Sequence, residues 1–529
     1  MNDERKEIGR ASFIMAFFTM ISRILGLVRN LLLSHFFGAT YISDAFIAAF
    51  TIPNALRRLF GEGALTPAFV STLTRAVKDS EDQKDPRIWQ NYFAQAFTWL
   101  TILLLIVCGL GILLAGPLVH LYVPDFIHVP GKMELTVSLT RFLFPFILFI
   151  GWAAFFMGVL NTFRSFGLPA FGPSLLNLSV IILVPVTFHF FSSESPYAIY
   201  VYGGAFLIGG LLQALIQVPK MMSLGARLRW SLSLSDPRIR ELGMILIPSA
   251  FAMGVYQLNI IVNRVFASGI EGAVSHLFFA DLILELPISL IATSLGTAVL
   301  PSFSRLMASN DKKGLADSFA YSLQGVWLLS IPAMMGMIAL SEPIVSTLYF
   351  SGKFTAHDLE NVRTCLIAYG VGLPFFAGMR ILTPVFFAAK DTRTPALVGL
   401  VALSVNFIMA WKFSGIFGAW GIALSTSISS VVNFMILAFL INRQHSDLPW
   451  GRIFGVTLRI ILGALIMGLS LKYTVEWLDL AIWKTQGVGL EKVLWLTALI
   501  SLGILVYAFA TRALGLKQLA KVFRGLKRS

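Results

Sequence analysis

The sequence predicts an all-α, polytopic membrane protein of about 14 transmembrane helices, in two pseudo-symmetric six-helix lobes plus two C-terminal helices. Of its 529 residues, 57% are hydrophobic and 13% are charged, whereas soluble domains carry roughly 25% charged residues. Apolar runs such as "VLWLTALISLGILVYAFA" recur along the chain, and each can cross a hydrocarbon core about 30 Å thick. In addition, a pattern of prolines and arginines occurs once in each half.

The expected spans follow from these apolar runs. They cover residues 10–37, 42–75, 91–118, 135–163, 169–191, 197–221, 240–267, 273–307, 315–349, 359–388, 394–413, 418–441, 453–474 and 493–512. The first run is too long for a signal-peptide core, so we expect it to remain as the first span. Internal prolines predict that the second and eighth spans are broken helices.

The spans and the charges between them predict the domain organisation. We expect an N-lobe over 1–222, a cytoplasmic amphipathic linker over 223–239, a C-lobe over 240–442, and two further spans with a basic tail over 443–529. With the N-terminus inside, the inner loops, tails and adjoining helix ends carry 26 Lys and Arg and the outer ones carry 6. The positive-inside rule therefore predicts that both termini are cytoplasmic. The net charge of +14 then reflects topology and contact with anionic lipid rather than nucleic-acid binding.

An internal duplication is predicted from proline spacing. Pro53 and Pro67 lie 14 residues apart, as do Pro287 and Pro301, and the offset between the pairs is 234 residues. The same offset sets Arg29–Asn30 against Asn263–Arg264. An offset of six spans preserves orientation, so the two lobes would be parallel repeats. The alternative is chance similarity between apolar segments.

Charged residues inside the spans predict the binding site. Five arginines lie deep in the expected spans, against three deep acids. The arginines are Arg23, Arg29, Arg57, Arg58 and Arg264, and the acids are Glu62, Asp281 and Glu285. Asn54, Arg57, Arg58 and Glu62 form one helical stripe, and Asp44 opens the second span. Interhelical salt bridges are the alternative, but a buried unpaired cation is costly, so the surplus predicts an anionic ligand in a cavity between the lobes.

Several other chemistries are not indicated by the sequence. Cys108 and Cys365 both fall in apolar segments and predict neither a disulfide nor a metal site. The seven histidines are scattered, and no HExxH motif, nucleophile elbow or phosphate-binding glycine loop occurs. We therefore expect no catalytic residue, no metal ligand and no cofactor.

Six motifs together resemble the MurJ (MviN) family of lipid II flippases, in the superfamily of drug and oligosaccharide-lipid exporters. They are "SRILGLVRN", "SDAFIAAFTIPNALRRLFGEGALTPAFV", "GVLNTFRSFGLPAFGPSLLN", "GTAVLPSFSR", "YFSGKFTAHD" and "AYGVGLPFFAGMRILTPVFFAAKDTRTP". The resemblance implies transport of lipid II, the undecaprenyl-diphosphate-linked peptidoglycan precursor, from the inner to the outer leaflet of the bacterial cytoplasmic membrane. It also implies functional roles for Arg23, Arg29, Arg57 and Asp44, and a groove for the polyprenyl tail at the last two spans.

Two positions depart from the family pattern. The family often has an acid where this chain has Asn30, and it commonly has an arginine where this chain has Leu282. The second departure removes one expected cation. We hypothesise that Arg264 supplies that charge from the neighbouring span.

The expected mechanism is alternating access, with lipid II and membrane lipids as partners. Coupling to the membrane potential or to a monovalent ion stays open, and cell-wall synthesis proteins are open candidates as partners of an expected monomer. Alternatives are a flippase for another polyprenyl-linked oligosaccharide, an exporter of cationic drugs, a membrane glycosyltransferase acting on polyprenyl carriers, or a scaffold. The arginine surplus disfavours cationic cargo, and the short outer loops disfavour an enzyme.

Overall fold

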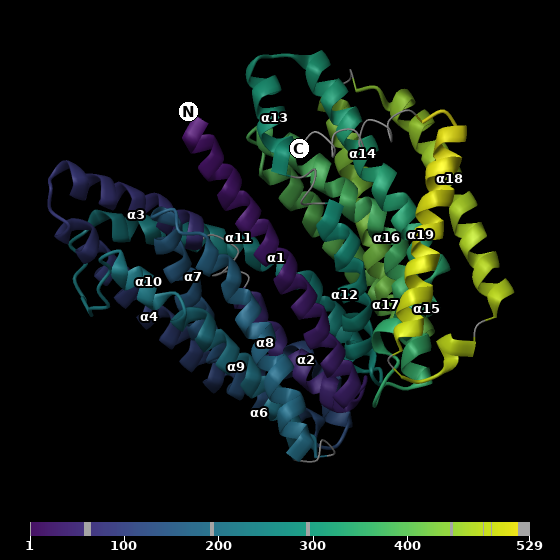
Figure 1. The fold of residues 1–529 in the computed structure, drawn as a ribbon, viewed down its shortest axis with the longest axis horizontal. Helices are drawn as coiled ribbons and strands as arrows, with labels where there is room; N and C mark the ends of the chain where they lie inside the picture. Colours follow the sequence, from purple (N-terminus) through teal and green to yellow (C-terminus); the bar gives the residue numbers. More distant parts are fainter. Residues whose placement is uncertain are drawn as a thin grey trace. The chain divides into compact units, whose positions relative to one another are not determined.

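A computed structural model describes residues 2–57, 65–190, 195–291, 297–444, 448–479, 481–487 and 489–516. All regular secondary structure in these ranges is helical (Figure 1). Contacts between Cα atoms divide the chain into two compact units, residues 1–269 and residues 270–529. They are called unit 1 and unit 2 below.

Unit 1 contains eleven α-helices in the part of the chain that is described. They are α1 (Asn2–Phe37), α2 (Tyr41–Arg57), α3 (Leu65–Asp82), α4 (Arg87–Leu113), α5 (Ala115–Tyr122), α6 (Lys132–Leu143), α7 (Phe146–Thr162), α8 (Gly167–Phe190), α9 (Ile199–Leu215), α10 (Val218–Ser223) and α11 (Pro237–Ser268). Short 3₁₀ helices η2 (Pro124–His128) and η3 (Pro196–Ala198) join some of them.

Unit 2 contains the remaining α-helices. They are α12 (Ala273–Ile291), α13 (Thr297–Ala308), α14 (Lys312–Ala339), α15 (Ser341–Tyr349), α16 (Ala356–Ala388), α17 (Arg393–Gln444), α18 (Trp450–Leu478) and α19 (Leu490–Ala513), with the 3₁₀ helix η5 (Ala481–Lys484) before α19. The α18 and α19 helices pack against each other and against α14.

Every predicted span coincides with a helix or with two consecutive helices. Eleven segments of the described residues are long and apolar enough to cross a membrane, so the chain is a multi-pass helical membrane protein. The count of fourteen spans and the division into two six-helix lobes stay predictions, as do the lobe boundaries. The second and eighth spans each consist of two helices, α2 with α3 and α12 with α13, and the residues between each pair lie outside the described ranges.

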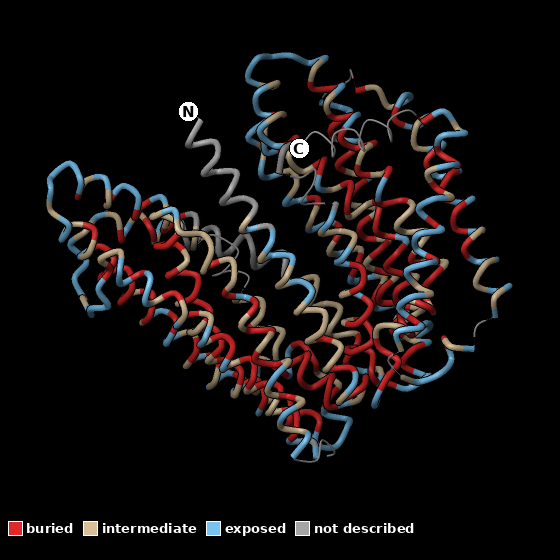
Figure 2. The backbone as a smooth tube through the Cα atoms, in the orientation of Figure 1, coloured by how far each residue is buried: buried red, intermediate tan, exposed pale blue. Residues whose placement is uncertain are grey.

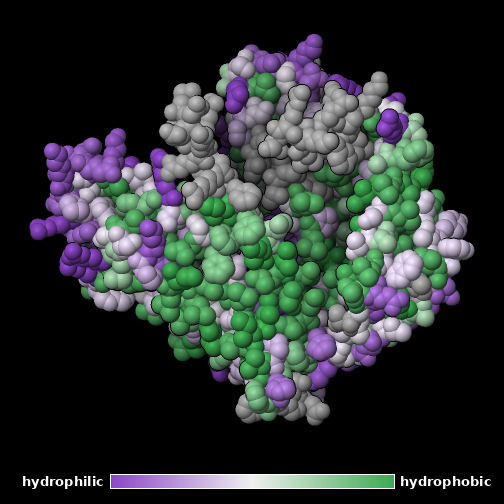
Figure 3. Space-filling view, in the orientation of Figure 1, coloured by the Kyte–Doolittle hydropathy of each residue, from purple (hydrophilic) through white to green (hydrophobic). Residues whose placement is uncertain are grey.

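Hydrophobic side chains are exposed on the sides of the helices, as lipid contact requires (Figure 3). The outward faces of α18 and α19 are largely apolar, with Phe454, Trp477 and Phe509 all more than two-thirds exposed. In unit 1, exposed hydrophilic residues gather where α3 meets α4, at residues 81–87. This distribution is typical of helices that end at the water–lipid boundary.

Small and hydroxyl-bearing residues bring the helices of each unit close together. In unit 1, the Ser179 hydroxyl of α8 donates to the Ala205 carbonyl of α9 at 2.7 Å. A Cβ on Gly209 would also clash with the Leu176 backbone. In unit 2, the Ser427 hydroxyl of α17 donates to the Ala368 carbonyl of α16 at 2.7 Å. Such contacts hold helices together in lipid, where no hydrophobic driving force acts between them, and Figure 2 shows the buried interior that results.

Gly418 reverses the chain within α17. Its φ of 62° and ψ of −141° are non-helical, and this is a region that essentially only glycine adopts. Across the reversal, the Ser425 hydroxyl donates to the Asn406 amide oxygen at 2.9 Å. The predicted eleventh and twelfth spans, 394–413 and 418–441, leave four residues between them; these residues are helical, and Gly418 alone makes the turn.

Candidate anion-binding site

Arg29 on α1 is held by the side chains of two asparagines. Its Nε and Nη2 donate to the Asn30 Oδ1 at 3.2 and 3.1 Å. Its Nη1 donates to the Oδ1 of Asn177 on α8 at 3.0 Å. A guanidinium has five N–H donors, so two remain after these three bonds.

Asn177 also binds α1 about two helical turns before Arg29. Its Nδ2 donates to the Ser22 carbonyl at 2.9 Å. On the α9 side, the Arg29 guanidinium carbon lies 5.0 Å from the centroid of the Phe206 ring, and the Tyr202 hydroxyl donates to the Arg29 carbonyl at 3.1 Å. The guanidinium is therefore fixed in position by α8 and α9 together.

Arg57 lies at the end of α2 and is held in the same way. Its Nε donates to the Asn54 Oδ1 at 2.9 Å, across one helical turn. This confirms the predicted shared face of Asn54 and Arg57. The positive charges of Arg57 and Arg29 repel each other electrostatically. The two guanidinium groups therefore influence each other's electrostatic environment.

Arg23 and Arg264 complete the predicted arginines within the described ranges. Arg23 is exposed on α1 and forms no hydrogen bond or ion pair with any described residue. Arg264 on α11 is partly buried. Burial raises the pKa of Tyr122 on α5, and the nearby Arg264 charge opposes that shift. Because the Tyr122 hydroxyl donates to the Ala48 carbonyl of α2 at 2.6 Å, Arg264 lies near the α2–α5 contact.

Asp44 takes part in a buried ion pair that the sequence did not reveal. Its Oδ2 lies 2.8 Å from the Nζ of Lys132, and the two side chains are 0% and 2% exposed. The Lys132 Nζ also lies 3.9 Å from the centroid of the Phe126 ring. Lys132 lies between the predicted third and fourth spans, where it begins α6 and joins that helix to the first turn of α2.

Four other residues were predicted for the site, two on the second span and two on the eighth. Arg58 and Glu62 lie outside the described residues. Asp281 and Glu285 are both exposed on α12 of unit 2.

Asn177 and Lys132 are the two residues that sequence reasoning missed at this site. A signal existed for Asn177, because a lone amide in the apolar span "PSLLNLSVIILV" is unusual in a membrane. For Lys132 there was none, because it follows the turn "VPG" and resembles an ordinary loop residue.

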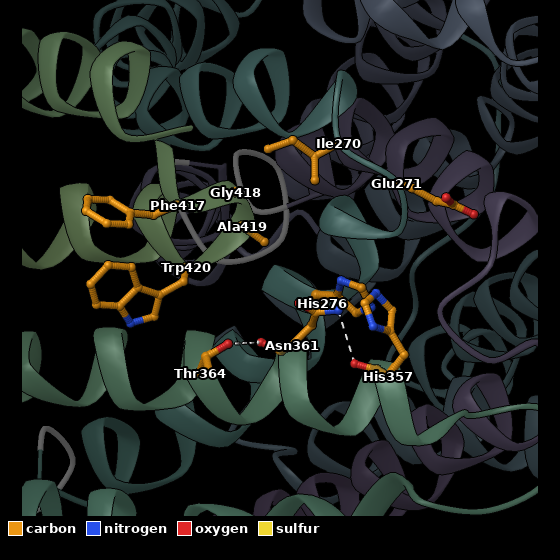
Figure 4. Close-up of a pocket in the computed structure, with 10 residues that line it drawn as sticks. All are labelled: Ile270, Glu271, His276, His357, Asn361, Thr364, Phe417, Gly418, Ala419 and Trp420. Carbon is orange, nitrogen blue, oxygen red and sulfur yellow. Dashed lines mark hydrogen bonds between the residues drawn. The ribbon is translucent and has the colours of Figure 1, made fainter. Parts of the chain in front are cut away.

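A second polar feature lies within unit 2, away from the predicted residues. A pocket of about 460 Å³ is lined by residues of α12, of α16 and of the Gly418 reversal, together with Ile270 and Glu271 (Figure 4). The buried His276 lines it, and its Nε2 lies 2.9 Å from the Asp358 Oδ1. The other oxygen of Asp358 accepts bonds from Thr355 at the start of α16. Within the described residues, no group of three or more His, Cys, Asp or Glu could hold a metal ion.

An arginine held by neutral amides inside an apolar helical bundle marks a functional site of a membrane protein, and substrate pathways of membrane transporters are one class of such sites. Comparison with known proteins identifies the member of that class. The family model described as "Lipid II flippase MurJ" matches residues 33–497, and the chain therefore belongs to the MurJ lipid II flippase family. This is a family of transporters, not enzymes, so a membrane glycosyltransferase is excluded.

Relatives and solved structures agree with this assignment. The chain is 32% identical to a probable lipid II flippase MurJ of Bdellovibrio bacteriovorus, over 99% of this chain and 98% of the relative. It is also 32% identical to the lipid II flippase MurJ of Burkholderia cenocepacia, over 84% and 86%. A lipid II flippase MurJ structure in an inward closed conformation matches with a TM-score of 0.77 and 28% identity, over 96% of this chain and 100% of that one. An inward-facing MATE transporter of the MOP superfamily shares the fold, at a TM-score of 0.64, 15% identity, and 82% and 98% coverage.

Proposed function

We propose that this protein flips lipid II from the inner to the outer leaflet of the cytoplasmic membrane by alternating access, using arginines of unit 1 to hold the diphosphate. Family membership and the names of the relatives support lipid II as the substrate. The arrangement of Arg29 and Arg57 supports the mode of binding.

The observation that carries the proposal is the neutrality of the groups that hold Arg29. Amide oxygens of Asn30 and Asn177 accept its hydrogen bonds, and no carboxylate among the described residues pairs with it. The side chain is thus oriented while its charge stays uncompensated. Because an unpaired buried cation is costly, the site favours an incoming anion.

A diphosphate fits this site for two reasons. Guanidinium groups bind phosphate oxygens through paired N–H donors, and two such donors of Arg29 are left over. Arg57 is oriented by another amide, that of Asn54, and lies in the same electric field as Arg29. An anion that binds to both would relieve their mutual repulsion.

In the proposed cycle, the protein opens to the inner leaflet and the arginines engage the diphosphate of lipid II. The head group then crosses the membrane through the protein while the polyprenyl tail stays in lipid, in the groove predicted at the last two spans. Opening to the outer leaflet weakens the grip and releases the product. The proposed cycle uses no metal or other cofactor.

A lipid II translocation assay in proteoliposomes tests the proposal. Arg23→Ala, Arg29→Ala, Arg57→Ala and Arg264→Ala are each expected to lower the flipping rate at least tenfold. Arg141→Ala is the matched control, because Arg141 is an exposed arginine of the predicted fourth span and should retain near wild-type activity. Unchanged rates in all four variants would overturn the proposal.

A flippase for another polyprenyl-linked oligosaccharide is the alternative substrate class. Competition distinguishes the two. An excess of unlabelled lipid II should block flipping of labelled lipid II, whereas a polyprenyl-linked O-antigen unit should compete weakly. Equal competition by both lipids would favour the broader specificity.

A further inference from the structure

A strap of twelve residues, 225–236, follows α10 and precedes α11 without regular secondary structure. It runs along the first half of α4. Gly225 lies beside Gln90, Ser231 beside Thr98, and the chain then returns to Gln95 before α11 begins. We call residues 225–236 the strap.

Polar side chains of α4 form hydrogen bonds with backbone N–H and carbonyl groups of the strap. Gln90 donates to the Gly225 carbonyl at 2.9 Å, and the Thr98 hydroxyl accepts from the Ser231 N–H at 2.9 Å. At longer range, 3.4 Å, the Trp99 Nε1 donates to the Ser233 carbonyl and the Gln95 Oε1 accepts from the Asp236 N–H. Irregular backbone at membrane depth is tolerated only where the protein supplies such partners.

The strap lies at the level of the polar–apolar boundary of the predicted third span. Its partners Gln90, Gln95, Thr98 and Trp99 all lie in the first half of α4 (87–113). Beyond them, α4 reads "LTILLLIVCGLGIL" and exposes Leu103, Ile106 and Leu110. An exposed segment beside the start of such a span is at head-group depth.

The side chains of the strap alternate between large apolar residues and arginine or serine. Leu228, Trp230, Leu232 and Leu234 are 42%, 68%, 69% and 63% exposed. In an extended chain, residues two apart share a face, so these four form an apolar row. The Trp230 ring also packs against Phe97 of α4, at 5.8 Å between centroids, and tryptophan is enriched at membrane interfaces.

Two exposed arginines accompany this row. Arg227 and Arg229 form no hydrogen bond or ion pair with any described residue. Nearby acids are engaged elsewhere, since Asp236 pairs with Arg238 at 3.3 Å and Glu241 with Arg75 at 2.6 Å. The two guanidinium groups are therefore available to an external anion, directly beside an exposed apolar row.

We propose that the strap is a binding site for anionic phospholipid in the leaflet that it contacts, which the positive-inside rule makes the cytoplasmic one. Leu228, Trp230, Leu232 and Leu234 enter the boundary between head groups and acyl chains. Arg227 and Arg229 bind the lipid phosphates. The strap thus anchors the connection between α10 and α11 to the bilayer, independently of the substrate site.

The depth of the strap can be measured with a spin label. Leu232→Cys carries a nitroxide in the full-length protein, reconstituted in nanodiscs containing phosphatidylglycerol. The two native cysteines are buried, and labelling of the unsubstituted protein corrects for them. We expect the label to be relaxed more by oxygen than by a water-soluble nickel chelate. Gln83→Cys, at the exposed turn between α3 and α4, is the control and should show the opposite order.

The preference for anionic lipid is tested by binding of short-chain lipids to the detergent-solubilised protein. Each arginine near an anionic surface contributes about 1 kcal/mol, so Arg227→Gln with Arg229→Gln should weaken phosphatidylglycerol binding on the order of 25-fold. Lys78→Gln with Lys84→Gln removes the same charge from exposed positions at the end of α3 and should change binding less than twofold. Phosphatidylcholine and free glycerol phosphate should bind weakly to all variants.

Three results would overturn the proposal. The first is a label at position 232 that is as water-accessible as the one at position 83. The second is equal binding of phosphatidylglycerol and phosphatidylcholine by the unsubstituted protein. The third is equal loss of phosphatidylglycerol binding in the strap variant and the control, which would make the effect one of overall charge. A water-accessible label would place the apolar row in solvent and not in the bilayer.

Discussion

Asn177 shows how one residue can orient an arginine without neutralising it. Its amide oxygen accepts from Arg29 and its amide nitrogen donates to the Ser22 carbonyl, so α1 and α8 are joined through both ends of one side chain. An aspartate there would accept the same bond from Arg29 but would add a negative charge. The choice of amide over carboxylate therefore keeps Arg29 available to an anion.

Two substitutions of Asn177 distinguish its effect on the orientation of Arg29 from its effect on the local charge. Asn177→Asp should form an ion pair with Arg29 and lower lipid II affinity at least tenfold, because a charge-assisted bond is roughly twice as strong as a neutral one and competes with the substrate. Asn177→Ala should retain the arginine charge and lose less affinity. Lipid II binding by native mass spectrometry measures both, and tighter binding to the aspartate variant would contradict the role of Arg29 as an anion-binding group.

Asp44 and Lys132 form the most deeply buried ion pair among the described residues. Removing Asp44 should destabilise the protein by about 3–5 kcal/mol, because the Lys132 charge then stays buried without the carboxylate that it pairs with. We expect this for Asp44→Asn in thermal unfolding of the detergent-solubilised protein, with Lys132→Gln measured beside it.

The double substitution Asp44→Asn with Lys132→Gln is the control for that pair. It removes the Lys132 charge together with the Asp44 carboxylate and should recover at least half of the stability that Asp44→Asn loses. If the double variant loses as much as the sum of the two single variants, the two side chains are not coupled. Recovery of stability without recovery of transport would show that Asp44 also acts in the transport cycle.

At the scale of elements, each unit has a buried pair of polar side chains at comparable positions. Asp44 is the fourth residue of α2, and His276 is the fourth residue of α12. Each pairs with a residue in the first turn of the helix that begins the fourth or tenth span, Lys132 in unit 1 and Asp358 in unit 2. In unit 1 the acidic residue of the pair lies on α2, whereas in unit 2 it lies on α16 and the histidine lies on α12. In both units the pair joins two helices.

Substitution of Gly418 tests whether the reversal within α17 requires a glycine at this position. Gly418→Ala should destabilise the protein by about 1–3 kcal/mol, because its backbone conformation is strained for any residue with a Cβ. Gly415→Ala is the matched control, since a Cβ there meets nothing within 4 Å and its backbone is helical, and it should leave stability unchanged or raise it slightly. Equal melting temperatures for both variants would show that the chain can reverse without this glycine.

At the scale of the whole molecule, transport of an anionic head group moves charge across the membrane. One elementary charge that crosses the full field changes the free energy by about 2.3 kcal/mol per 100 mV, so a third of that at the barrier changes the rate about fourfold. We expect an inside-negative potential to speed outward flipping of lipid II in proteoliposomes. Potassium diffusion potentials of either sign provide the measurement. Rates independent of the potential would indicate compensation by a co-transported ion.

Much of the fold could be predicted from the sequence. Apolar runs determine where spans occur, because each must satisfy its own backbone in lipid, and every predicted span coincides with helix. The exact positions of breaks within helices were harder to predict, since the expected spans leave four residues between 413 and 418, whereas Gly418 alone forms the reversal. The strap was predicted only as an amphipathic linker over 223–239, and its backbone partners on α4 could not be derived from periodicity.

The sequence by itself determined the membrane class, the approximate spans and the surplus of buried arginine, because these depend on composition and on the cost of charge in lipid. Only the tertiary structure decided which side chains meet. It set Arg29 against Asn177, at a separation of 148 residues, and Asp44 against Lys132, at a separation of 88. Such pairs depend on the packing of helices that are distant in the chain, and no local pattern encodes that packing.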